Sequence, residues 1–241
     1  MFCDLGPLPN LTLPVALAVV GTAAGYWVEK QIRLRIRRRR LMKQGFSPSD
    51  LTSKDRAFKK LGEILVAKIP QRISFNEVDS HSWSEPAKYE QAKAAFESLG
   101  FQRSSSFVAS PQEWVVEFWL GPRPQLWAKI IDSRERGVYS EVSVTNSDGT
   151  TNSFENTEEC GLQHREKDKW VHCGLVAPAQ LVERALREWP AGCGEPMKLA
   201  ECLSAYEQSV NEYLAWRRSV GISADEMKRT LELRKKRRSR A

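Results

Sequence analysis

An uncharged stretch near the start of the chain places the first constraint on the fold. Residues 5–28 are 24 consecutive positions without a formal charge. A helix rises about 1.5 Å per residue, so a helix of this length covers the roughly 30 Å hydrocarbon core of a bilayer. The stretch therefore predicts a transmembrane helix within an N-terminal unit of residues 1–28. A buried helix and a cleaved signal peptide are the alternatives.

Basic residues follow this stretch and do not precede it. Residues 29–50, interpreted as a basic juxtamembrane segment and linker, hold eight Lys and Arg, whereas residues 1–4 carry only Asp4. A signal peptide carries its basic residues before the apolar stretch, so the order found here is the reverse. Because basic flanks stay in the cytoplasm, the sequence predicts a single-pass membrane protein. Its N-terminus is expected outside and its C-terminal domain in the cytoplasm.

Side chains at the end of the stretch suit a membrane boundary. Amphipathic rings favour the interface, and arginines bind anionic headgroups. The predicted interface residues are Tyr26, Trp27, Arg33, Arg35, Arg37, Arg38, Arg39 and Arg40. Gly21 and Gly25 have the GxxxG spacing that lets two helices approach closely, which predicts packing against a partner helix or a homo-oligomer. The lipid bilayer and its anionic headgroups are therefore expected partners.

The rest of the chain shows helical and strand periodicity. Apolar residues at helical spacing predict helices over residues 53–70, 84–101, 177–190 and 195–221. Ser223 and Glu226 have capping-box form and predict a last, basic helix or tail over residues 223–241. Alternating β-branched and aromatic residues predict strands over residues 101–109, 114–120, 126–131, 138–146 and 150–156.

These elements predict an α+β domain over residues 51–222. We expect an antiparallel β-meander of four or five strands with flanking helices packed on one face. Asp148-Gly149 supplies the turn of one hairpin. Strand alternation also predicts an aromatic platform of Trp119, Trp127 and Tyr139, provided that their strand faces coincide. The alternative is that helices cover these rings and that they belong to the core.

Charge is concentrated at the two ends of the chain. The net charge is +7, yet residues 44–227 hold 21 Lys and Arg against 27 Asp and Glu, a net charge of −6. An acidic body disfavours a nucleic-acid-binding core. The basic tail is expected to bind anionic lipid in preference to RNA or an acidic protein, because headgroups are the nearest polyanion to a tethered chain.

One segment holds residues that can ligate metals or act as nucleophiles: Cys160, His164, His172 and Cys173. Their spacing differs from the close ligand pairs of structural zinc sites, and the adjacent His172 and Cys173 point to opposite faces if the segment is extended. The five scattered cysteines indicate a reducing compartment. The sequence contains no GxGxxG, GxxxxGK[ST], GxSxG or HExxH motif. We therefore assign no catalytic residue, cofactor or metal, and an enzyme that uses this cluster stays the alternative hypothesis.

Three stretches of the sequence, in the order in which they occur along the chain, resemble motifs of a known protein family. "FESLGF", "VYSEVSVTNSDGT" and "APAQLVERALREWP" resemble a family of uncharacterised bacterial proteins with no assigned function. The resemblance covers roughly residues 85–218 and implies a bacterial origin and domain limits, but no activity. With a bacterial origin, the membrane that the predicted span crosses is expected to be the bacterial inner (plasma) membrane. The predicted function is a membrane-anchored cytoplasmic domain that binds a ligand or a membrane or cytoplasmic protein.

Overall fold

The computed structural model describes residues 40–239 except 48, 135, 147–149, 160, 166–168 and 189–195. The chain divides into two compact units, residues 1–60 and 61–241. In the first unit, the 3-10 helix η1 (Ser49–Leu51) precedes the start of helix α2 (Lys54–Ala67). The carboxylate of Asp50 accepts a 2.7 Å hydrogen bond from the backbone N–H of Ser47, which closes the turn before α2.

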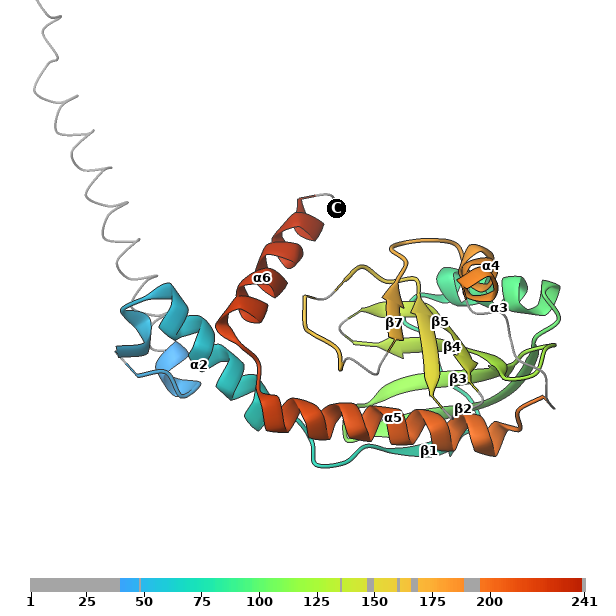
Figure 1. Ribbon diagram of the computed structural model, residues 1–241, viewed down its shortest axis with the longest axis horizontal. Helices are drawn as coiled ribbons and strands as arrows, with labels where there is room; N and C mark the ends of the chain where they lie inside the picture. Colours follow the sequence, from blue (N-terminus) through green and yellow to red (C-terminus); the bar gives the residue numbers. More distant parts are fainter. Residues whose placement is uncertain are drawn as a thin grey trace, which may run out of the picture. The chain divides into compact units, whose positions relative to one another are not determined.

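The second unit is built on a sheet in which seven strands lie in chain order within the described residues (Figure 1). The strands are β1 (Ser74–Val78), β2 (Gln102–Ser110), β3 (Trp114–Leu120), β4 (Leu126–Ser133), β5 (Gly137–Thr145), β6 (Thr151–Glu155) and β7 (Lys169–His172). Strands β1 to β6 pair antiparallel, and β7 pairs parallel to β6. The sheet is therefore mixed, with β7 at one edge.

Helices cover both faces of this sheet, as Figure 1 shows. The covering helices are α3 (Pro86–Ser98), α4 (Pro178–Glu188) and α5 (Leu199–Val220), and α6 (Ala224–Arg238) follows α5 in the chain. Helices α3 and α4 pack on one face, here called the α3/α4 face, and their core includes Phe96, Trp119 and Ile130. Helix α5 packs on the other, the α5 face, whose core includes Trp127 and Tyr206.

Strand alternation separates these two cores. In β3 and β4, Trp119 lies opposite Ala128, so the residue before Ala128, Trp127, projects from the other face. Trp119 and Trp127 are both fully buried. The sheet therefore lies between the two cores.

The predicted fold class is wrong in two respects. The sheet is a mixed sheet of seven strands, not an antiparallel meander of four or five, because β1 and parallel β7 extend the meander. Helices cover both faces, not one. The five predicted strands correspond to β2 to β6, and the predicted helices to α2 to α6. Strand β7 has only four residues, "KWVH", which is too short to show a clear period of two.

The prediction of a single-pass inner-membrane protein is also corrected. No helix in the described part of the chain is long and apolar enough to cross a bilayer. The expected span over residues 5–28, with Gly21 and Gly25, and the interface residues before Arg40 lie outside the described residues. Arg40 itself is exposed in a short helical segment. We therefore withdraw the single-pass topology and the membrane location.

Candidate functional site

Four polar side chains form one row across the α5 face, running from β4 to β7. Lys129 lies opposite Glu141, Glu141 opposite Glu155, and Glu155 opposite His172 in the strand register. Residues paired in this way have neighbouring side chains on the same face. We call Lys129, Glu141, Glu155 and His172 the polar row.

The first half of the polar row is a buried ion pair. Nζ of Lys129 lies 2.6 Å from Oε1 of Glu141, and each side chain is 1% exposed. The Lys129 ammonium also lies 3.9 Å from the ring centroid of Tyr206 on α5, a cation–π contact. Burial lowers the pKa of Lys129, and the neighbouring Glu141 opposes that effect. Oε2 of Glu141 has no hydrogen-bond partner in the structure.

The second half of the polar row is a carboxylate that holds a histidine. Oε1 of Glu155 lies 2.5 Å from Nδ1 of His172 and accepts a 2.6 Å hydrogen bond from the hydroxyl of Thr157. Arg136 donates to the same carboxylate at 3.2 Å. Burial acts to raise the pKa of Glu155, but the hydrogen bond from His172 and the charge of Arg136 outweigh it and hold the pKa below its ordinary value.

A second histidine faces the first. Nε2 of His164 lies 3.3 Å from Nε2 of His172. The His164 ring has aromatic contacts with Trp170 of β7 at 5.5 Å and with Tyr213 of α5 at 5.9 Å between ring centroids. The neighbouring Arg165 forms a 2.9 Å ion pair with Glu212 of α5. The loop that carries His164 is therefore fixed by contacts with both a strand and a helix.

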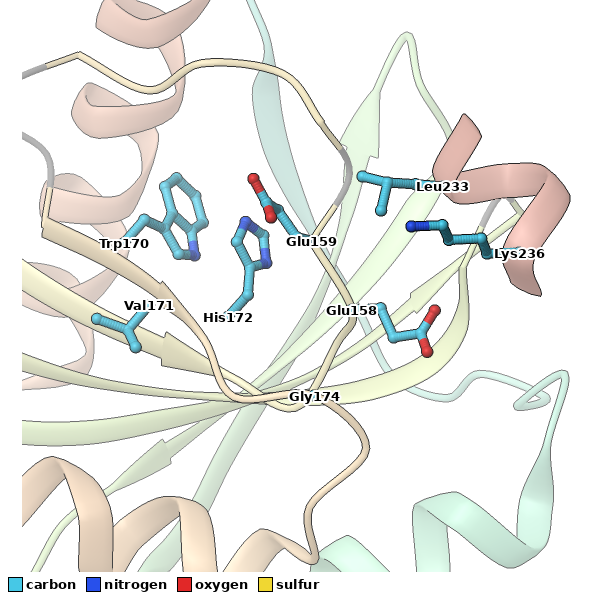
Figure 2. A pocket seen from close by; sticks show the side chains of 8 residues that line it. All are labelled: Glu158, Glu159, Trp170, Val171, His172, Gly174, Leu233 and Lys236. Atoms are coloured by element: carbon cyan, nitrogen blue, oxygen red, sulfur yellow. The ribbon is translucent and has the colours of Figure 1, made fainter. Parts of the chain in front are cut away.

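A hollow of about 570 Å³ lies between β7 and α6. Figure 2 shows Trp170 and His172 on the β7 side and Leu233 and Lys236 on the α6 side. The lining residues are Glu158, Glu159, Trp170, Val171, His172, Gly174, Leu233 and Lys236. His172 thus ends the polar row at the wall of an open cavity.

Helix α6 is held in place by a buried ion pair with α5. Arg217 lies 2.8 Å from Glu226, and their side chains are 2% and 7% exposed. Arg217 also donates to the backbone carbonyls of Gln163 and Gly221. Ser223 and Glu226 form the predicted capping box, with hydrogen bonds of 3.0 and 3.2 Å. The start of α6, and with it one wall of the hollow, is therefore positioned by α5.

The predicted cluster is brought together only in part. His164 and His172 meet, whereas Cys173 packs toward the α3/α4 face and Cys160 lies outside the described residues. Burial raises the pKa of the Cys173 thiol. The expectation that His172 and Cys173 point to opposite faces is confirmed. In the part of the chain that the structure describes, no group of three or more His, Cys, Asp or Glu could hold a metal ion.

The predicted aromatic platform does not form. Trp119 is buried against α3 and Trp127 against α5, on opposite faces of the sheet. Tyr139 lies on the α5 face with Trp127 and is partly buried. The three rings therefore share no surface, and the two tryptophans belong to the core.

Sequence reasoning did not identify Glu155, Arg136 and Trp170 as site residues. Their roles depend on strand register and on loop closure, which the local pattern does not encode. One signal was present, because Lys129 in "LWAKII" lies between Trp127 and Ile131 on an otherwise apolar strand face. A charge at an inward-facing position requires a partner.

Comparison with known proteins found no matching protein family, no matching curated protein and no matching solved structure. The resemblance to a family of uncharacterised bacterial proteins therefore stays a prediction. The candidate site is defined by its own geometry.

Proposed function

We propose that this chain is a ligand-binding domain whose site is the hollow between β7 and α6. Its volume of about 570 Å³ lies within the range of roughly 300–1,000 Å³ that is usual for small-molecule sites. The hollow combines apolar surface from Leu233 and Trp170 with a few polar groups, as such sites do.

The observation that carries this proposal is the way in which His172 is held. Glu155 fixes Nδ1 of His172 at 2.5 Å, and Thr157 and Arg136 fix Glu155 in turn. The His172 side chain is 11% exposed and lines the hollow. Both ring nitrogens have neighbours, Glu155 at Nδ1 and His164 at Nε2, so the imidazole presents a preorganised ring to a ligand in the hollow.

The lining residues indicate the chemistry of the ligand. The buried indole N–H of Trp170 has no hydrogen-bond partner in the structure, and a buried donor of this kind calls for an acceptor. Lys236 supplies positive charge and Leu233 an apolar contact, whereas Glu158 and Glu159 supply negative charge. Glu159 is paired with Arg229. The N–H of Trp170 and the ammonium of Lys236 favour a small aromatic or heterocyclic compound that carries a hydrogen-bond acceptor, such as a carboxylate.

Binding is favoured over catalysis by what lines the hollow. Among the described lining residues there is no Ser, Thr or Cys that His172 could activate as a nucleophile. Cys173 packs toward the other face of the sheet. The enzyme hypothesis that rests on the 160–173 cluster therefore gains no support from the described residues.

The proposal is tested by the indole N–H resonance of Trp170 in an NMR spectrum of the full chain, assigned with a Trp170→Phe variant. The protein is titrated with aromatic carboxylates, aromatic amines and free amino acids. We expect aromatic carboxylates to shift this resonance saturably. We expect His172→Ala to weaken that binding at least tenfold.

His81→Ala is the matched control, because His81 also contacts a carboxylate, that of Asp132, at 3.1 Å, but does not line the hollow. Circular dichroism checks that each variant is folded. The proposal fails if no compound moves the Trp170 resonance, or if binding is the same in the His172 and His81 variants.

A further inference from the structure

We infer that His164 and His172, of which His172 lines the hollow, form a binding site for one divalent transition-metal ion. The inference rests in part on the proposed function, because the hollow supplies the access path and room for further ligands. It goes beyond that function by naming an inorganic ligand and the two nitrogen atoms that bind it.

The spacing of the two histidines suits a shared ion. Their Nε2 atoms are 3.3 Å apart. Two imidazole nitrogens bound tetrahedrally to Zn²⁺, each about 2.0–2.1 Å away, are separated by about 3.3–3.4 Å. The ring centroids are 5.4 Å apart and the planes differ by 50°, so the rings meet through their nitrogen edges and do not stack.

The surroundings of His172 match those of a metal ligand. A ligating histidine usually donates its other ring N–H to a carboxylate, which fixes the tautomer and orients the ring. Oε1 of Glu155 lies 2.5 Å from Nδ1 of His172 and occupies that position. With the proton on Nδ1, the lone pair of Nε2 faces His164 and is available to an ion.

The His164 ring is oriented by different means. It lies in contact with Trp170 of β7 and Tyr213 of α5. The side chains of this pair come from a loop and from an edge strand, and each is held by neighbours outside the pair. Two ligands fixed in this way lose little side-chain freedom when an ion binds.

The protein supplies two nitrogen ligands from the described residues, which hold no group of three His, Cys, Asp or Glu suited to a metal. Water, or an acceptor on a compound bound in the hollow, completes the coordination. Imidazole ligands suit Zn²⁺, Cu²⁺, Ni²⁺ and Co²⁺ better than Mg²⁺ or Ca²⁺. The competing interpretation is a hydrogen bond between two neutral imidazoles, which binds no ion.

The test is titration of the chelator-treated, reduced full chain with Zn²⁺, followed by calorimetry and by the ring nitrogen resonances of its histidines. The chain has three histidines, so His81 serves as an internal control. We expect one Zn²⁺ per chain and shifts at the Nε2 atoms of His164 and His172 only. A result in which no imidazole resonance moves would overturn the inference.

Variants give a second measurement. His164→Ala and His172→Ala are expected to weaken Zn²⁺ binding at least tenfold, and Glu155→Gln by about 10–100-fold, the usual effect of losing an outer-shell partner. His81→Ala is expected to bind as the unmodified chain does. Equal affinity in the His164 and His81 variants would assign the ion to other residues and contradict the inference.

The two proposals fail separately. Titration of the Trp170 resonance with aromatic carboxylates is repeated in the presence of a chelator. Ligand binding without any Zn²⁺ binding would overturn only the metal site. Zn²⁺ binding at the two histidines without binding of any organic compound would instead overturn the small-molecule function.

Discussion

At neighbouring positions of β4, the two faces of the sheet are stabilised by different means. Under α3 and α4, Ile130, Phe96 and Trp119 bury apolar surface, whereas under α5 the neighbouring residue Lys129 is paired with Glu141. Apolar burial needs no specific partner, but each buried charge does. Buried charge is not confined to the α5 face, because Glu117 on the α3/α4 face is fully buried and pairs with Arg103 at 2.7 Å. The polar row of the α5 face is the one that reaches the hollow.

Removing one member of the buried ion pair is expected to have the largest effect. Lys129→Met leaves Glu141 buried without its cation, which is expected to lower the free energy of unfolding by about 3–5 kcal/mol. Replacing both charges, with Lys129→Met and Glu141→Leu, is expected to recover most of that loss. Urea denaturation measures both. A single variant as stable as the unmodified chain would show that the pair is not buried.

Truncating the adjacent residue tests the other face. Ile130→Ala removes buried apolar volume between the sheet and α3, and is expected to cost about 2–5 kcal/mol. No second substitution is expected to rescue it by restoring a pairing, in contrast to Lys129. The same denaturation experiment applies, with the exposed Leu175 changed to Ala as a control. A loss as small as that of the control would contradict the assigned core.

Acid is expected to weaken the α5 face in a way that depends on Glu155. Its folded pKa is lowered below the ordinary value of 4.5. The stabilisation is therefore fully present above about pH 4.5 and is lost as the pH falls from there through the lowered folded pKa. Thermal unfolding between acid and neutral pH measures this slope. Glu155→Gln is expected to reduce the dependence of the unfolding temperature on pH. An unchanged dependence would show that Glu155 does not contribute to the loss of stability in acid.

The smallest expected effect is at the start of α6. Ser223→Ala removes the hydroxyl that accepts the backbone N–H of Glu226. Loss of such a cap costs about 1 kcal/mol, within a range of about 0.5–2. Thermal unfolding measures the loss of stability of the whole domain. Faster amide hydrogen exchange at Glu226 shows that the loss arises at this cap. Unchanged exchange would show that the cap does not hold this wall of the hollow.

The sequence predicted the local elements better than their assembly. Strands β2 to β6 were identified because β-branched and aromatic residues alternate over their length. Strand β7 was missed because Lys169 and His172 leave too little apolar pattern in four residues. The covering of both faces was missed because helical periodicity shows that a helix has an apolar side, but not which layer that side contacts.

The candidate site was predictable by residue type and not by contact. His164 and His172 were named from their capacity to bind metals, but Cys173, adjacent in sequence, faces the other core. Glu155 became part of the site only through its register with His172. Pairings between strands distant in sequence depend on the whole sheet, which is why sequence spacing alone gave a different cluster.

The polar row also links the interior of the sheet to the hollow electrostatically. Its four members occupy neighbouring strands, so it extends about 14 Å at the usual strand spacing of about 4.8 Å. Charges in a protein interior are screened far less by salt than charges in water. Coupling between two sites is reciprocal. An ion or ligand held at His172 is therefore expected to change the proton affinity of Lys129, and the charge on Lys129 to change the affinity at His172 equally.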